Sequence, residues 1–369
     1  MPGYAPAVTG LAERLAERTL ELVNIPSESR HESEIREHLL ALVPEGLEVG
    51  YGDDEAYLLV PTRRPSAPLV ILAGHYDTVP AQDNLPGRIA GGAVHGLGAS
   101  DMKGGVAVAL ELVRALAGGE PGRYDVGLLL FGREELSAEH NPLPALLAGS
   151  RAVHDAALAI VLEPTDGQLQ AGCLGHLTAR LSFSGTSGHS ARPWQADNAI
   201  ERAIAGLAPI LEHEPREAIV GGLTFREVIS VTRLQAGTAD NVIPGLAVAT
   251  VSFRYAPDCT PEAAEEGLRS LASRASQIEL TGNSPPGSVV TDNPLLAKLL
   301  EAGALGVEPK QAWTNVADFS AAGIDAVNFG PGATAQAHRG DEHVEIAALV
   351  HAYETLDRFL GGAIGEDAR

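Results

Sequence analysis

The sequence predicts an α/β fold, in which a mixed and largely parallel sheet forms a catalytic domain that carries an inserted ferredoxin-like α+β domain. Short, continuous apolar runs at 69–73, 126–131 and 158–162 predict strands covered on both faces, as in parallel sheets. An Ala/Val/Leu-rich stretch at 104–116 predicts a helix between the first two strands. From about residue 177, apolar and polar residues alternate, which predicts half-exposed strands of an antiparallel sheet.

Two further helices are expected before the first buried strand. Residues 11–23 place leucine and valine at helical spacing. Ser29 followed by Glu32 matches a capping box, which predicts a second helix that ends near Leu42. Helices that alternate with buried strands are typical of an α/β domain.

The alternating region predicts six elements in the order β-α-β-β-α-β, which is the ferredoxin-like arrangement. These elements lie at 177–183, 198–211, 228–234, 248–255, 260–272 and 278–280. A stretch with two prolines and a glycine at 283–288 predicts the return to the first domain, which then adds a helix at 295–305 and a strand at 327–329.

The domain boundaries follow from this change of pattern. We expect residues 1–176 and 287–369 to form the first, metal-binding domain, and residues 177–286 to form the inserted domain. A chain of 369 residues, 45% of them hydrophobic, is long enough for two such cores.

Composition narrows the class of protein. The formal net charge of −22 argues against a nucleic-acid partner and against attachment to an anionic membrane. No apolar run reaches membrane-spanning length, and the start of the chain lacks the pattern of a secretory signal. Two cysteines far apart, Cys173 and Cys259, do not indicate a disulfide framework. We expect a cytoplasmic enzyme or binding protein.

Side chains that can bind metal follow the ends of four predicted strands. They are His75 with Asp77, Glu134 with Glu135, Glu163, and, after a Gly-Pro-Gly turn, His338. Sites in open α/β sheets form beyond the carboxyl ends of the strands, so this placement is itself informative. A further candidate, Asp101, precedes the helix at 104–116, where an isolated aspartate would more often be an N-terminal cap.

The residue types indicate a divalent metal. Two histidines with several carboxylates suit zinc, cobalt or manganese better than copper or an iron–sulfur cluster. Asp77 lies two residues beyond His75, so on an extended segment it can hold the second nitrogen of that imidazole. The adjacent Glu134 and Glu135 repel one another unless a cation lies beside them, with one carboxylate as ligand and the other free to transfer a proton.

The order of these fragments resembles the M20 family of dinuclear metallo-amidohydrolases. The matching stretches are Gly-His-Tyr-Asp-Thr-Val-Pro, Ser-Asp-Met-Lys-Gly-Gly, Glu-Glu, Glu-Pro-Thr and a late Ala-His. The resemblance implies two divalent metal ions, zinc with cobalt as the alternative, bridged by Asp101. It assigns His75 and Glu163 to one metal, Glu135 and His338 to the other, Glu134 to general base and acid catalysis, and Asp77 to orienting His75.

Other stretches resemble the family members, particularly the actinobacterial form, that hydrolyse N-succinyl-LL-2,6-diaminopimelate in lysine and diaminopimelate biosynthesis. They include His-Ser-Ala-Arg, Asn-Val-Ile-Pro and Phe-Arg-Tyr-Ala-Pro. This resemblance implies a homodimer formed through the inserted lid domain, in which His189 reaches the partner's active site and binds the developing oxyanion. It also implies that Arg254 clamps a substrate carboxylate, with Asn241 and Arg192 in the same substrate site. From sequence alone, His189 is equally well a turn residue and Arg254 an ordinary solvated strand arginine.

One departure from that pattern concerns the substrate. Asp318 stands where these relatives present an arginine to a substrate carboxylate, and an aspartate would repel that group. Arg192, Arg339 or Lys310 are the cations that could compensate. Hydrolysis of an N-acyl amino acid amide is therefore expected, with two alternatives: an M20 enzyme for another N-acyl amino acid or dipeptide, and a catalytically silent metal-binding protein.

Overall fold

The structure is a computed structural model that describes residues 10–119, 122–136 and 138–361. The chain divides into two compact units: unit 1 contains 1–171, 290–308 and 318–369, and unit 2 contains 172–289 and 309–317. The sequence predicted domain boundaries at 176/177 and 286/287, and the structure places them at 171/172 and 289/290. The sequence assigned 309–317 to the first domain, but in the structure this segment pairs with unit 2. The Leu174 amide donates to the Ala312 carbonyl at 3.2 Å, and the Trp313 indole donates to the Pro285 carbonyl at 3.0 Å.

Unit 1 is built on a mixed eight-stranded sheet whose centre is parallel, as expected. The strand order is β1-β2-β6-β3-β7-β18-β8-β17. The strands are β1 (Leu47–Gly52), β2 (Ala56–Pro61), β3 (Leu69–His75), β6 (Asp125–Phe131), β7 (Ala156–Val161), β8 (Leu169–Ala171), β17 (Val307–Pro309) and β18 (Ala326–Asn328). The neighbours β6, β3, β7 and β18 run parallel, so their carboxyl ends meet at one edge. Both β3 and β6 are buried along their whole length, which requires cover on both faces.

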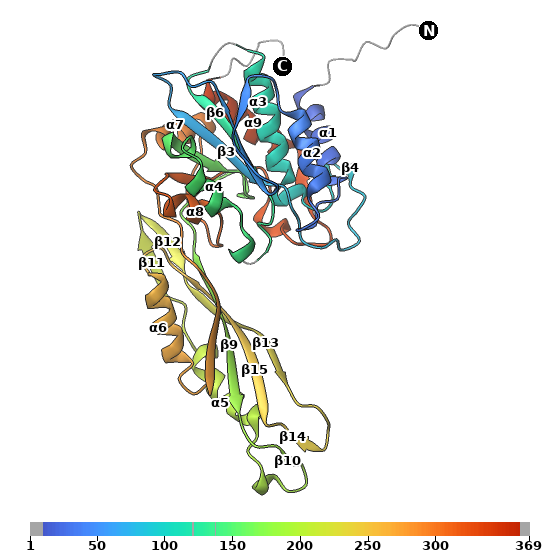
Figure 1. The fold of residues 1–369 in the computed structure, drawn as a ribbon, viewed down its shortest axis with the longest axis vertical. Helices are drawn as coiled ribbons and strands as arrows, with labels where there is room; N and C mark the ends of the chain where they lie inside the picture. Colours follow the sequence, from blue (N-terminus) through green and yellow to red (C-terminus); the bar gives the residue numbers. More distant parts are fainter. Residues whose placement is uncertain (1–9, 120–121, 137, 362–369) are drawn as a thin grey trace. The chain divides into compact units, whose positions relative to one another are not determined.

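Helices supply that cover. They are α1 (Leu11–Val23), α2 (Ser33–Leu42), α3 (Gly104–Ala117), α4 (Leu143–Gly149), α7 (Pro294–Gly303), α8 (Val316–Ala321) and α9 (Ile346–Leu360). Figure 1 shows α3 beside β3 and β6, with α1 and α9 packed against it. A small separate sheet contains β4 (Arg88–Ala90), β5 (Ala93–His95) and β19 (His343–Glu345). None of the helices in the described ranges combines the length and the apolar character that a membrane span requires.

The predicted capping box before α2 is wrong. The helix begins at Ser33 with Glu32 at the N-cap position, and no side chain caps it. The Ser29 hydroxyl instead donates to Asp77 Oδ2 at 2.6 Å, so tertiary contact has replaced the local pattern. The alternative of an N-terminal cap for Asp101 is likewise not realised, because α3 begins at Gly104 after Lys103.

Unit 2 is a four-stranded antiparallel sheet with two helices, and its element order confirms the ferredoxin-like expectation. The strand order is β13-β15-β9-β16. Its elements are β9 (Gly175–Ser184), α5 (Ala199–Leu211), β13 (Val228–Ala236), β15 (Leu246–Tyr255), α6 (Pro261–Leu271) and β16 (Gln277–Ser284). The sequence missed a hairpin, β11 (Glu217–Val220) with β12 (Leu223–Arg226), and a short ribbon, β10 (Gly188–His189) with β14 (Val242–Ile243).

The alternation of apolar residues explains the one-sided core of unit 2. Leu181 and Phe183 of β9 join Ala249 of β15 in one buried cluster with Leu207 of α5 and Leu268 of α6. Both helices therefore cover the same face of the sheet. The intervening polar residues leave the opposite face without helices of this unit, as expected for half-exposed strands.

The close approach of α3 to the end of β7 generates a stability prediction. A Cβ on Gly105 would meet the carbonyl oxygen of Leu162 and lie 2.8 Å from its Cβ. Alanine gains about 1 kcal/mol of helix propensity over glycine, whereas forcing atoms into a packed core costs about 1–3 kcal/mol. We expect Gly105→Ala to lower the melting temperature. The matched control is Gly267→Ala on α6, where a Cβ has nothing within 4 Å and should leave the melting temperature unchanged or raise it. Equal melting temperatures for the two variants would contradict this packing argument.

Candidate metal centre

Parallel strand ends bring the candidate ligands together in unit 1. His75 is the last residue of β3, Glu134 and Glu135 follow β6, and Glu163 follows β7. Asp101 lies in the irregular turn Ala99–Lys103, which begins after Gly98 in a left-handed conformation, with φ 77°. The remaining candidate is the loop histidine after β18, His338.

Asp101 lies between the two histidines. Its Oδ1 is 3.2 Å from His75 Nε2, and its Oδ2 is 3.7 Å from His338 Nε2. On the first side, His75 Nε2 is 4.0 Å from Glu163 Oε1; on the other, His338 Nε2 is 2.9 Å from Glu135 Oε2. The structure therefore brings two three-residue groups of potential ligands together around one shared carboxylate.

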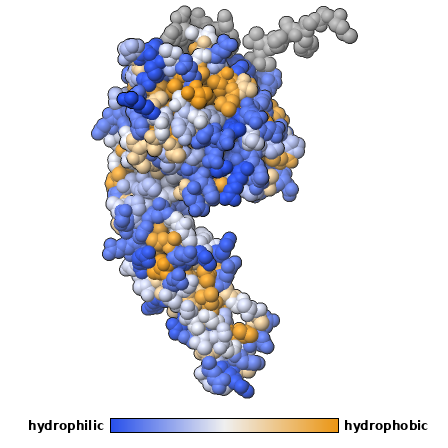
Figure 2. Space-filling model, in the orientation of Figure 1, coloured by the Kyte–Doolittle hydropathy of each residue, from blue (hydrophilic) through white to orange (hydrophobic). Residues whose placement is uncertain are grey.

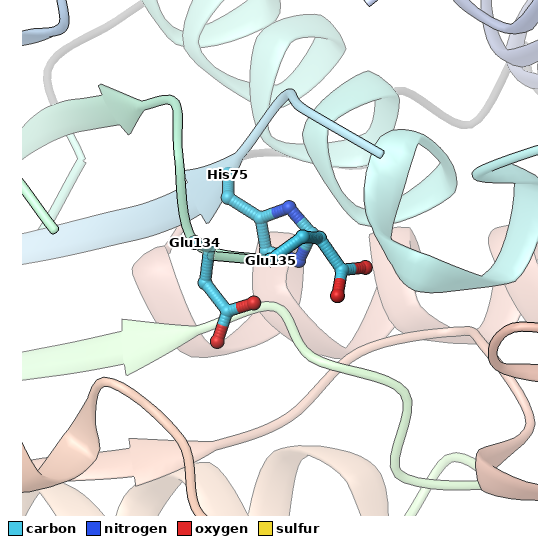
Figure 3. Close-up of side chains that lie close together, drawn as sticks. All are labelled: His75, Glu134 and Glu135. Carbon is cyan, nitrogen blue, oxygen red and sulfur yellow. The ribbon is translucent and has the colours of Figure 1, made fainter. Parts of the chain in front are cut away.

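A third group places the two adjacent glutamates at the same imidazole. His75, Glu134 and Glu135 have donor atoms within 4.8 Å of one another. In Figure 3 the two glutamate side chains diverge from neighbouring backbone positions, with the His75 ring close to both. Adjacent carboxylates can therefore serve different purposes at one site.

The electrostatics of the centre favour a cation. Burial raises the pKa of Glu134 well above its ordinary value, and although His75 opposes that rise, the carboxylates of Glu163, Glu135 and Asp101 add to it. Burial disfavours a charged His75, but hydrogen bonds to Asp101 and Asp77 raise its pKa well above the ordinary value. A hydrogen bond to Glu135 similarly raises the pKa of His338 to about 9. The carboxylates thus raise the affinity of the imidazoles for protons, and a divalent cation would neutralise the same negative charge. Imidazole with carboxylate is also a donor set that suits zinc.

Asp77 contacts both His75 and the backbone of the adjacent glutamates. Its side chain is fully buried, and its Oδ1 lies 3.4 Å from His75 Nδ1. The backbone amides of Glu134 and Glu135 donate to Oδ1 and Oδ2 at 3.1 and 3.2 Å, and Ser29 donates to Oδ2. Although burial favours the protonated acid, the hydrogen bond and charge of His75, with the hydrogen bonds from Ser29 and the Glu135 amide, hold the pKa of Asp77 below its usual range. One carboxylate thus fixes a candidate ligand and the backbone of the glutamate pair.

Two residues at this centre were missed from sequence. Ser29 was assigned to a helix cap, and Glu342, which accepts three backbone hydrogen bonds beside Asp101, carried no motif at all. Neither has a local signal, because their partners lie 48 residues away for Ser29 and more than 240 residues away for Glu342.

Arg192 and Asn241, which were predicted to bind substrate, and His189, which was predicted to act in catalysis, lie together in unit 2. The Ser190 amide donates to the Asn241 carbonyl at 3.0 Å across the β10–β14 ribbon, and the Arg192 amide donates to the His189 carbonyl at 2.8 Å. All three predicted side chains, His189, Arg192 and Asn241, are exposed. They form an exposed polar group at one end of unit 2.

Arg254 does not belong to that group. It lies on β15 opposite His176 of β9 and is partly buried. No acidic side chain in the described part of the chain forms an ion pair with it, and burial lowers its pKa. Burial and the nearby guanidinium together lower the pKa of His176 to about 4. A partly buried guanidinium without an acidic partner is a suitable group to bind an anion.

Asp318 lies on α8 and accepts a hydrogen bond from the Asn141 side chain at 2.8 Å. Of the cations considered as compensation, Arg339 forms an ion pair with Asp341 at 2.7 Å, and Lys310 is buried in unit 2.

Comparisons with known proteins agree with this geometry. Residues 71–361 match the model of peptidase family M20/M25/M40. A putative succinyl-diaminopimelate desuccinylase of Mycobacterium tuberculosis is 38% identical over 350 residues, which cover 94% of this chain and 98% of that protein. The succinyl-diaminopimelate desuccinylase of Corynebacterium glutamicum is 34% identical over 357 residues, 93% of this chain and 95% of that protein. The fold is similar to that of aminopeptidase PepT from Bacillus cereus, with a TM-score of 0.74 at 18% identity over 95% of this chain and 98% of that chain.

Proposed function

Because the chain belongs to peptidase family M20/M25/M40, we propose that it hydrolyses the amide of N-succinyl-LL-2,6-diaminopimelate to succinate and LL-diaminopimelate. Family membership makes the protein a metal-dependent amidohydrolase with a small-molecule substrate. The observation that carries the chemical proposal is Asp101, whose two oxygens face two different histidines. The substrate is supported by the two desuccinylases, which align with this chain over nearly its whole length.

The ligand groups define where two metal ions would be held. Asp101 would be shared, with His75 and Glu163 on one side and Glu135 and His338 on the other. Zinc is the ion proposed, with cobalt as the alternative, because both accept imidazole and carboxylate ligands. When bound, the metals supply Lewis acidity and lower the pKa of water.

Glu134 is the proposed proton carrier. It lies in neither ligand group around Asp101, yet it is close to His75 and its pKa is raised. In this role its carboxylate takes a proton from the attacking water as the new C–O bond forms. The same proton then passes to the amine nitrogen as the amide C–N bond breaks, which frees the amine. The second proton of the water stays on the new carboxyl group until that group ionises to give succinate.

Unit 2 offers the groups proposed for substrate recognition. Arg254 suits a carboxylate, because its guanidinium is partly buried and has no acidic partner in the described residues. His189, with Asn241 and Arg192 nearby, is proposed to act on the active site of a second copy, where an imidazole N–H would stabilise the oxyanion.

Such a role requires a homodimer, which the surface of unit 2 supports. In the described residues β13 pairs on one side only, with β15, so its other edge is available for a strand of a second copy. On α5, Ile204 and Leu211 are 62% and 68% exposed, and Leu234 of β13 is 48% exposed. Figure 2 shows apolar patches interrupting the hydrophilic surface of unit 2. A two-fold contact through β13 and α5 would bury such residues.

Asp318 favours a second candidate function. If its carboxylate faces the substrate, it disfavours a second acidic group there, and another N-acyl amino acid or a dipeptide would be cleaved instead. The third possibility is a metal-binding protein without catalytic activity. It does not account for Glu134, which lies beside the centre but in neither ligand group around Asp101.

A substrate panel tests the proposed reaction. We expect the zinc- or cobalt-loaded protein to hydrolyse N-succinyl-LL-2,6-diaminopimelate with a kcat/KM at least about 10-fold above that for N-acetyl amino acids and dipeptides, since lost charge-assisted contacts are worth more than about 1.4 kcal/mol. Dialysis against a chelator should abolish the activity, and added metal should restore it. A preference for N-acetyl amino acids or dipeptides would support the second candidate function. Activity that survives chelation would show that catalysis does not depend on the proposed metal ions.

A substitution separates proton transfer from metal binding. We expect Glu134→Ala to lower kcat by about 100-fold or more, because general acid–base catalysis contributes about 10²–10⁴-fold. Metal content, measured by elemental analysis, should stay at the parent value because the ligand groups around Asp101 remain. The control is Glu37→Ala, which changes an exposed glutamate of α2. Retained turnover in the Glu134 variant would remove this residue from the mechanism.

The dimer has its own test. Sedimentation velocity should show the parent as a dimer and Ile204→Lys as a monomer, because a buried, unpaired ammonium opposes association. The control is Ile219→Lys, which places the same charge on an isoleucine of β11 that is 77% exposed. A monomeric parent, or dimers of equal stability in both variants, would contradict the interface through α5.

A further inference from the structure

Glu342 lies in the loop between His338 and β19 and is only 2% exposed. Its Oε1 accepts hydrogen bonds from the backbone amides of Ser100 and Asp101 at 2.9 and 3.0 Å. Its Oε2 accepts one from the amide of Gly98 at 2.9 Å. A single buried side chain therefore binds three amides of the turn that carries Asp101.

These contacts define the position of that turn. Buried amides need partners, and in this irregular segment neither a helix nor a strand supplies them. The Gly96 amide also donates to the main-chain carbonyl of Glu342 at 3.0 Å. Four of the six residues from Gly96 to Asp101 are thus hydrogen-bonded to one residue.

The same residue is joined to the other side of the centre. Glu342 follows His338 by four positions, and its amide donates to the Arg339 carbonyl at 3.3 Å. The His338 carbonyl in turn accepts a hydrogen bond from the Gln82 side chain at 3.0 Å. Glu342 therefore connects the turn that presents Asp101 to the loop that presents His338.

We propose that Glu342 is a positioning residue that fixes Asp101 relative to His338 and thereby sets the affinity of the centre for its metal ions. The inference rests on the proposed metal centre, since it concerns the geometry of two of its ligands. Residues that orient metal ligands through hydrogen bonds typically change metal affinity by about 10- to 100-fold when they are replaced.

Two substitutions separate hydrogen bonding from charge. Glu342→Gln keeps the length of the side chain, but its amide NH₂ must face at least one backbone N–H, so at least one hydrogen bond is lost. Glu342→Asp keeps the negative charge but is one methylene too short to reach all three amides. The matched control is Asp341→Asn, which makes the same carboxylate-to-amide change at the adjacent, exposed position.

The experiment is a calorimetric titration of the chelator-treated full chain with Co²⁺ or Zn²⁺. We expect both Glu342 variants to bind metal about 10- to 100-fold more weakly and Asp341→Asn to stay within about twofold of the parent. Melting temperatures of the metal-free proteins provide the readout of fold stability, and activity should recover in excess metal.

Several outcomes would overturn the proposal. Parent-like metal affinity in both Glu342 variants would show that these hydrogen bonds do not determine the affinity of the centre for metal. Parent-like affinity in the aspartate variant alone would assign the effect to charge. Two variants that fail to fold without metal would assign Glu342 to the fold instead. A parent that binds no metal would refute the proposed function itself, and this result is distinct from a difference between parent and variants.

Discussion

The crowding of carboxylates at one edge of a sheet is the constraint on which the rest of unit 1 depends. Asp101, Glu134, Glu135 and Glu163 gather around two imidazoles, and burial together with the neighbouring carboxylates raises the pKa of Glu134. Such a group is stable only when positive charge lies within it, and two divalent ions supply that charge in the proposed function. The parallel neighbours β6, β3 and β7 bring three of the contributing segments to the same edge.

Backbone amides, rather than further cations, hold the acidic residues around the centre. Asp77 binds the amides of both adjacent glutamates, and Glu342 binds three amides of the turn before α3. These buried carboxylates thereby obtain hydrogen-bond partners from the backbone, which burial requires. The same hydrogen bonds connect segments that have no regular secondary structure to the rest of the centre.

The sequence was informative where local pattern and function coincide. Apolar runs identified the buried strands, and the residues after them included the histidine and glutamates that the structure brings together. It failed where a contact is remote: Ser29 matched a helix cap but bonds to Asp77, and residues 309–317 pair with unit 2 although their neighbours belong to unit 1. Backbone amides that donate to a distant carboxylate leave no trace in residue type, so Glu342 could not be found in this way.

In the proposed function, chemistry and substrate selection belong to different units. The candidate ligands and Glu134 lie in unit 1, whereas Arg254 and His189 lie in unit 2. Asp318 lies in unit 1 and accepts a hydrogen bond from the Asn141 side chain. Arg254 has no acidic partner among the described residues, and in the proposed function it would bind a substrate carboxylate from unit 2. If Arg254 has this role, an acidic acyl group would not require an arginine at position 318.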